Sequence, residues 1–142
     1  MREGRFLHSL FVRYTKETPA GERIPYLQDE ALTPPVLLRL TGQIAAGQVT
    51  FIQMDNETRE DSLVMDIRDG WGTVYLVKDV EQYYELINSQ EPDSQEPLSI
   101  TGNGPTPKRH ATQDLDLLGE IAAEFWKTGK PWSGCQWEHT IH

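Results

Sequence analysis

The chain has 142 residues, of which 37% are hydrophobic and 25% are charged. This size and balance predict one domain with a core of its own, and they exclude wholesale disorder. The formal net charge of −9 arises between Gln53 and Glu96, where twelve acidic residues oppose three basic ones. This distribution argues against nucleic acid as a partner and favours a basic protein surface, although acidic loops that only keep a protein soluble are the competing interpretation.

The cysteine content and the hydropathy of the chain limit its possible cellular locations. Cys135 is the single cysteine, which excludes an internal disulfide framework. The apolar run Phe6–Val12 is interrupted by His8 and Ser9, so no signal peptide is apparent. No stretch approaches the roughly 20 apolar residues of a membrane span. We therefore expect a cytoplasmic protein that makes no use of a membrane.

The first third of the chain predicts one strand and one helix. Phe6–Tyr14 is rich in β-branched and aromatic residues, which is typical of a strand. Thr15–Glu30 contains two prolines and a glycine and is predicted to be an irregular connection. Thr33–Pro35 places prolines in the first turn of a helix, whose apolar stripe ends near Gly47.

The middle of the chain predicts consecutive strands joined by short turns, such as the turn at Asp69-Gly70. Val80–Ile87 fits a helical stripe or a strand, and its adjacent tyrosines favour the strand. The expected strands are Val49–Met54, Leu63–Ile67, Thr73–Val77, Val80–Ile87 and Leu98–Ile100. These strands predict a single α+β domain over residues 1–142, with a mostly antiparallel sheet of about five to six strands and two main helices packed on it.

The clearest predicted element is a helix from about Thr112 to Lys127, because apolar residues recur at i, i+3, i+4 and i+7. Thr112 is the expected N-cap, and Gly129 suits the left-handed residue that ends a helix. Pro131 prevents its continuation. A compact aromatic tail is expected to follow, with Phe125, Trp126 and Trp137 in the core.

Two patterns suggest ligand binding, and both have simpler explanations. The glycine-containing loop Gly102–His110 precedes a helix, but it lacks the spacing of a phosphate-binding loop. Cys135, His139 and His142 have a spacing that metal ligands use, but a structural zinc site needs four ligands. We therefore predict no metal and no cofactor.

Catalysis has weak support in the sequence. Cys135 with His110 or His139 would supply a nucleophile and a base, but no motif surrounds the cysteine. The many carboxylates lie in predicted turns, where burial is not expected to shift their pKa values. We therefore predict no catalytic residues and a protein that is not an enzyme.

Aromatic residues beside the acidic turns are candidates for an interface. Trp71 follows the turn at Asp69-Gly70, and a large aromatic there is either half-buried packing or an interface anchor beside the turn Asp55–Asp61. The expected partner-binding residues are Asp55, Glu57, Glu60, Asp61, Trp71, Asp79, Glu81 and Glu85.

The C-terminal third carries a resemblance. Ala122–Pro131 followed by Trp137-Glu138 resembles the ending of the first-numbered immunity protein family of bacterial polymorphic toxin systems. Asp69–Tyr75 and Gln82–Leu86 are similar to the central strands of that family, so the likeness covers roughly residues 49–138. It implies a small α+β protein that binds and neutralises a cognate toxin, commonly a nuclease or another nucleic-acid-modifying enzyme. Phe125, Gly129 and Trp137 match its motif and look structural.

The resulting hypothesis is an immunity-type inhibitor that covers a basic toxin domain with an acidic surface. Two alternatives remain open at this point. One is an acidic adaptor or regulatory module with a non-toxin partner, and the other is a small enzyme that uses Cys135 or the Gly102–His110 loop.

Overall fold

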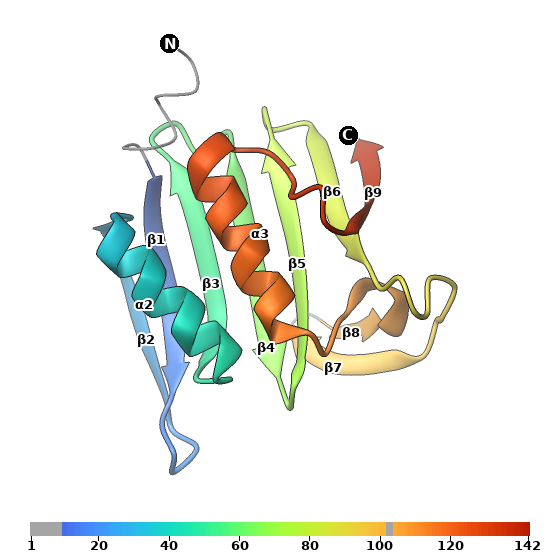
Figure 1. The fold of residues 1–142 in the computed structure, drawn as a ribbon, viewed down its shortest axis with the longest axis horizontal. Helices are drawn as coiled ribbons and strands as arrows, with labels where there is room; N and C mark the ends of the chain where they lie inside the picture. The colour runs from blue at the N-terminus through green and yellow to red at the C-terminus, as the bar shows by residue number, and fades with distance from the viewer. Residues whose placement is uncertain (1–9, 102–103) are drawn as a thin grey trace.

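Seven antiparallel strands form the main sheet of the computed structural model, which describes residues 10–101 and 104–142 (Figure 1). The order across the sheet is β2-β1-β3-β4-β5-β6-β9. The strands are β1 (Leu10–Glu17), β2 (Arg23–Ala31), β3 (Val49–Asn56), β4 (Ser62–Arg68), β5 (Trp71–Lys78), β6 (Gln82–Ile87) and β9 (Gln136–Ile141). Strands β3 to β6 pair in sequential order, so the predicted α+β class and the meander are confirmed, as is the strand within Val80–Ile87.

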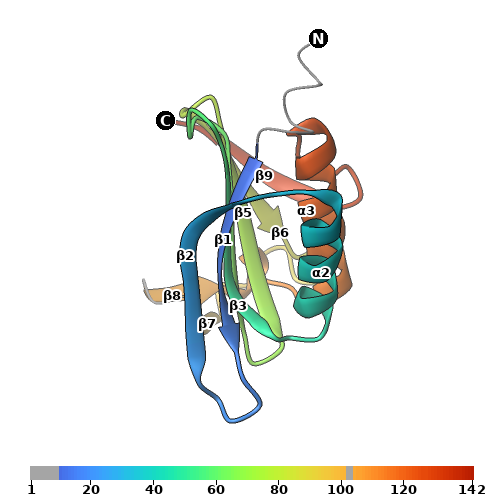
Figure 2. The ribbon, with the colours of Figure 1, turned by 90° about the vertical axis from the view of Figure 1, so that its left-hand side faces the viewer.

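Two helices lie side by side on one face of this sheet (Figures 1 and 2). Helix α2 is Pro34–Ala45 and helix α3 is Leu115–Thr128, as the apolar stripes predict. Gly129 ends α3 with φ 72°, and its N–H donates to the Phe125 carbonyl. No helix in the described ranges has the length and apolar character needed to cross a membrane.

The predicted N-cap of α3 is wrong by two residues. The Asp114 carboxylate accepts a hydrogen bond from the Leu117 N–H and is the N-cap. Thr112 lies before the helix: its hydroxyl accepts from the Asp114 N–H at 3.0 Å, and its backbone exchanges two hydrogen bonds of 2.8 Å with Gly72 on β5. The start of α3 is thus tied to the sheet.

The core lies between the sheet and the helices. Alternate residues of the strands point to this face, and Ile52, Met65 and Leu76 are completely buried there with Phe125 of α3. A Cβ at Gly72 would overlap the Leu118 side chain, so glycine permits the close approach of α3 to β5. The half-buried Trp126 and Trp137 pack against this core, and their indole N–H groups donate to backbone carbonyls.

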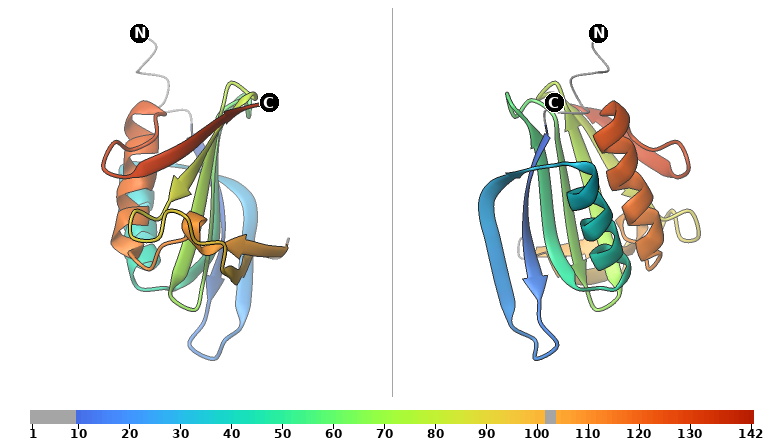
Figure 3. Two further views of the ribbon diagram at one scale, coloured as in Figure 1. Left: turned by 90° about the vertical axis from the view of Figure 1, so that its right-hand side faces the viewer. Right: turned by 60° about the vertical axis from the view of Figure 1, so that its left-hand side comes forward.

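A small hairpin lies on the opposite face of the sheet (Figures 2 and 3). It consists of β7 (Pro97–Thr101) and β8 (Gly104–Pro107), and the short 3-10 helix η1 (Lys108–His110) follows it. Thr73 on β5 donates its hydroxyl to the His110 carbonyl at 2.7 Å. The predicted loop Gly102–His110 is therefore a strand and a 3-10 helix from Gly104 onward, while residues 102–103 lie outside the described residues.

Both edges of the sheet differ from the sequence prediction. Thr15–Glu30 was expected to be irregular, yet most of it belongs to β1 and the edge strand β2. Strand β2 tolerates Pro25 because, among the described residues, no strand pairs with its outer side. The expected aromatic tail contains β9, the other edge strand. The predicted first strand begins at Phe6, and residues 6–9 lie outside the described residues.

Candidate functional site

Two acidic turns meet at one end of the sheet (Figures 1 and 2). The Val80 N–H in the β5–β6 turn donates to the Glu60 carbonyl in the β3–β4 turn at 3.0 Å, and the His142 N–H donates to the Glu81 carbonyl at 2.9 Å. We call Glu57, Glu60, Asp79, Val80 and Glu81 the acidic corner, and all five are exposed. These residues come from two parts of the chain that only the fold brings together.

Asp55 and Asp61 do not belong to this exposed surface. Each is only 3% exposed, so the expectation that they face a partner is wrong. Asp55 accepts from Ser62 at 2.6 Å and pairs with Arg13 and Arg59 at 3.3 and 3.1 Å. Buried carboxylates require such partners, because an unpaired charge away from water is strongly disfavoured.

Asp61 supports the acidic corner from within. Its carboxylate pairs with Lys78 at 3.0 Å and accepts the Asp79 N–H at 3.0 Å. Both bonds cross between the β3–β4 and β5–β6 turns, so Asp61 fixes one turn against the other.

Val80 is the apolar tip of the acidic corner, and sequence reasoning missed it. It is 59% exposed, and its φ of 69° is rare for a β-branched residue. Asp79 also has a positive φ, of 54°. Strained backbone of this kind persists only where surrounding contacts hold it, and it is concentrated at functional sites. The signal in the sequence is the tight link between β5 and β6, which leaves Val80 no place in a strand.

Trp71 lies at the other end of β5 from the acidic corner. The expectation that it neighbours the acidic turn is therefore wrong. The Lys108 ammonium sits 5.4 Å from the centre of its ring and pairs with Glu91 and Glu96 at 3.6 and 3.3 Å. Trp71 also lines a groove of about 580 Å³ with Asp114, Leu117 and Cys135. The ring is therefore half-buried, with one part packed against Lys108 and another part facing the groove.

Cys135 is poorly suited to nucleophilic attack. Burial raises the pKa of its thiol to about 11, so the thiolate is scarce at neutral pH. The Cys135 Sγ faces the Trp132 carbonyl at 3.9 Å, while the His110 ring nitrogens face Leu86 and Glu138. The structure does not bring this cysteine and this histidine together.

The two C-terminal histidines pack on aromatic rings. His139 stacks on Tyr84 with a centroid distance of 4.3 Å, and His142 meets the Tyr83 ring edge-on at 4.4 Å. Tyr83 and Tyr84 are successive residues of β6, so they point to opposite faces. The Cys135, His139 and His142 spacing therefore does not form a common site.

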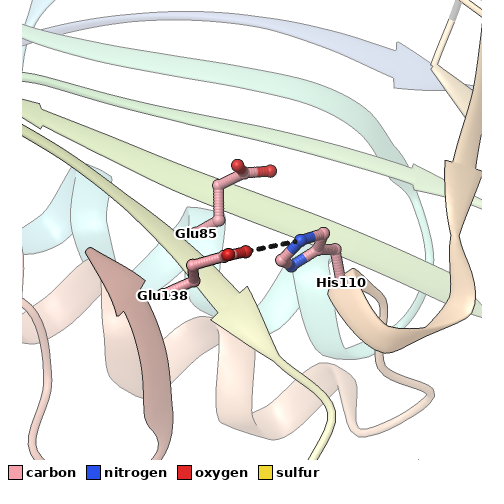
Figure 4. Close-up of side chains that lie close together, drawn as sticks. All are labelled: Glu85, His110 and Glu138. Atoms are coloured by element: carbon pink, nitrogen blue, oxygen red, sulfur yellow. Dashed lines mark ion pairs between the residues drawn. The ribbon is translucent and has the colours of Figure 1, made fainter. Parts of the chain in front are cut away.

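A separate polar cluster lies on the hairpin side of the sheet (Figure 4). Glu85 of β6 and Glu138 of β9 are directly opposite each other in the ladder, and His110 of η1 lies beside them. Sequence reasoning assigned Glu85 to the partner surface and missed this cluster, because its members are widely separated in the chain.

Comparison with known proteins shows the fold. A crystal structure of a hypothetical protein from Neisseria gonorrhoeae is similar, with a TM-score of 0.63 and 14% sequence identity. The likeness covers 91% of this chain and 94% of that one. No family model and no curated protein matches the chain.

Asp66 is a further charged residue on the hairpin side of the sheet. Burial raises the pKa of its carboxyl group from 3.8 to about 6, against the opposing effect of Arg68. The expectation that burial does not shift the pKa values of the carboxylates was made for turns, and Asp66 lies within the predicted strand Leu63–Ile67. Its place in the middle of β4, between Phe51 of β3 and Thr73 of β5, accounts for the loss of solvent.

Proposed function

We propose that this protein is an immunity-type inhibitor that binds a basic toxin domain in the cytoplasm through its acidic corner. The observation that carries the proposal is an exposed apolar residue, Val80, held in an unfavourable backbone conformation among four exposed carboxylates. Charged rims speed association, and desolvated apolar contacts at the centre slow dissociation. The resemblance to immunity proteins points to the same class of partner.

The charges of the acidic corner are available to a partner. In the described part of the chain, the carboxylates of Glu57, Glu60, Asp79 and Glu81 form no ion pair, whereas Glu91 and Glu96 are both paired with Lys108. Arg59 shares the β3–β4 turn, but its guanidinium is engaged by Asp29 and Asp55 at 2.9 and 3.1 Å. The described residues therefore leave the negative charge of the acidic corner uncompensated.

The acidic corner is also held in place before binding. Asp61 and the Val80 N–H join the two turns, and Asp55 holds the start of the first turn through Arg59. A surface that is already ordered loses little conformational freedom when a partner binds, so more of the interaction energy appears as affinity.

Charge reversal tests the role of the carboxylates of the acidic corner. Glu60→Lys with Glu81→Lys should slow association with the proposed cognate toxin domain, to be sought in the neighbouring reading frame, by about tenfold at low salt, because steering is lost. The matched control is Asp93→Lys with Glu120→Lys, which makes the same change in net charge at exposed positions elsewhere. Surface plasmon resonance at two salt concentrations is the measurement, and the difference should shrink at the higher one. Equal slowing by both double variants would show that only net charge matters.

The substitution Val80→Gly independently tests whether the Val80 side chain contributes to binding. Glycine adopts positive φ without strain, so this variant should be at least as stable as the wild type. Removal of the apolar contact should speed dissociation from the toxin domain while leaving association unchanged. An unchanged dissociation rate would place the centre of the interface elsewhere.

Neutralisation distinguishes the inhibitor from an acidic adaptor with a non-toxin partner. Coexpression of the wild-type protein should rescue cells from growth arrest by the toxin domain, and the Glu60→Lys/Glu81→Lys variant should not. Absence of rescue by the wild type, in cells that contain the folded protein, would favour the adaptor.

A further inference from the structure

We propose that Glu85, His110 and Glu138 bind one divalent transition-metal ion of the Zn²⁺ type. Three separate elements, β6, η1 and β9, supply these side chains, and their ligand atoms all lie within 4.8 Å of one another (Figure 4). This site is distinct from the acidic corner, and it does not depend on the function proposed there.

The buried imidazole is oriented as a metal ligand would be. His110 is only 5% exposed, and its Nδ1 lies 2.8 Å from the Leu86 carbonyl oxygen. A carbonyl only accepts hydrogen bonds, so Nδ1 carries a proton and donates to Leu86. Nε2 lies 3.0 Å from Oε1 of Glu138, which is a hydrogen-bond distance, and a metal ion bound here would take the place of the proton between these two atoms. Histidines that bind metals commonly donate the other ring N–H to a backbone carbonyl in this way.

The two carboxylates also favour a cation. Glu85 and Glu138 face each other across the β6–β9 ladder, and like charges in this position destabilise a sheet. The Glu85 carboxylate has no hydrogen bond or ion pair to any residue in the ranges that the structure describes. A cation that replaces the proton between His110 and Glu138 would be bound by Nε2 and both carboxylates together.

The dimensions suit zinc. Zn²⁺ binds nitrogen and oxygen at about 2.0–2.2 Å, so neighbouring ligand atoms in a tetrahedral site lie about 3.3 Å apart. The His110–Glu138 distance of 3.0 Å is already near this value, and Glu85 is exposed and able to turn toward it. One nitrogen and two oxygens leave a fourth position for water on the solvent side.

Arg109 limits the affinity of this site for a metal ion. Its Nη1 lies 3.3 Å from the same Oε1 atom of Glu138 that faces His110. The guanidinium therefore competes with a metal ion for this oxygen and repels its charge. Arg109→Gln should consequently tighten zinc binding several-fold, the opposite of what loss of a ligand would do.

Isothermal titration of the metal-free protein with zinc chloride tests the site. We expect one ion per wild-type chain, and Glu85→Gln should weaken binding by more than about tenfold. Glu85 makes no bond that folding depends on, and its neutralisation relieves the repulsion from Glu138, so the melting temperature without zinc should be equal to that of the wild type or slightly higher. Zinc should then raise the melting temperature of the wild type more than that of Glu85→Gln.

The matched control is His139→Gln, which removes an exposed imidazole from the same strand without touching the cluster. This variant should bind zinc like the wild type. Three results would overturn the proposal: no binding by the wild type at millimolar zinc, loss of binding in His139→Gln but not in Glu85→Gln, or weaker binding after Arg109→Gln.

Discussion

The two faces of the main sheet are made from the same strands but hold different groups. On the helix side, Ile52, Met65 and Leu76 pack with Phe125 and are fully buried. On the hairpin side, the neighbouring residues include Asp55 and Asp66, together with Glu85 and Glu138 at the β6–β9 edge. One face is a continuous apolar core, whereas the other places partly desolvated charges among apolar and aromatic residues such as Val64 and Tyr75.

This difference separates the residues that make the fold stable from those available for binding. The helix side gains its stability from area removed from water, and it needs no particular partner for each side chain. On the hairpin side the charges differ in their surroundings: the buried Asp55 depends on Arg13 and Ser62, whereas the Glu85 carboxylate forms no ion pair with any described residue. Substitutions should therefore act mainly on stability on the first face, and on charge, pH response or ligand binding on the second.

The largest expected effect is on the helix side. Phe125→Ala should lower the free energy of unfolding by about 3–5 kcal/mol, because the ring is completely buried and its removal leaves a cavity. Urea denaturation followed by circular dichroism is the measurement. Leu38→Ala on helix α2 is the control, since Leu38 is 75% exposed and its truncation should change stability little. Similar losses in both variants would contradict the assigned core.

A smaller effect of opposite sign is expected for Asp66→Asn. The pKa of Asp66 rises from 3.8 to about 6 in the folded protein, so the folded state holds this proton more strongly than the unfolded state. Stability therefore falls as pH increases through this window, and the full penalty is present above pH 6. Asparagine removes the penalty, so the variant should be more stable than the wild type at pH 7.5 by about 1–2 kcal/mol, after allowance for partial exposure.

Denaturation of wild type and Asp66→Asn at pH 7.5 and pH 3.5 checks this sign. The difference should nearly vanish at the acid pH, where Asp66 is mostly protonated in both the folded and the unfolded state. A variant that is less stable than the wild type at pH 7.5 would mean that the ionised Asp66 is favourably paired.

The smallest effect is expected at Cys135. Cys135→Ser should change stability by about 1 kcal/mol or less, because the side chain is only half-buried. Binding of the toxin domain should be unaffected, as measured by surface plasmon resonance. Loss of function in a protein of wild-type stability would instead revive an enzyme that uses this thiol.

The elements that local sequence determines were predictable. The apolar stripe of α3, its end at Gly129 and the turn at Asp69-Gly70 each depend on residues close in sequence. Strand β2 was not predictable in this way, because Pro25 opposes a central strand and only the sheet order shows that β2 is an edge. The position of the Asp114 N-cap likewise follows from the pairing of Thr112 with Gly72, forty residues away.

The candidate sites depend more on contacts between distant residues. The exposed acids Glu57, Glu60, Asp79 and Glu81 were predicted, because acidic turns are visible in the sequence. The burial of Asp55 was not, since it requires Arg13 from another strand, 42 residues away. The same limit explains why the cluster of Glu85, His110 and Glu138 became visible only in the structure.

The position of β9 at the edge of the sheet has a consequence for the order of folding. The β6–β9 ladder joins residues between 49 and 59 positions apart, whereas β3 to β6 form a meander of local hairpins. Closing a long loop costs more chain entropy, so contacts of this kind tend to form late. We expect the meander to assemble first and β9 to dock afterwards, which delays the meeting of Glu138 with Glu85 and His110. Mutations in β9 should therefore speed unfolding while leaving the folding rate nearly unchanged.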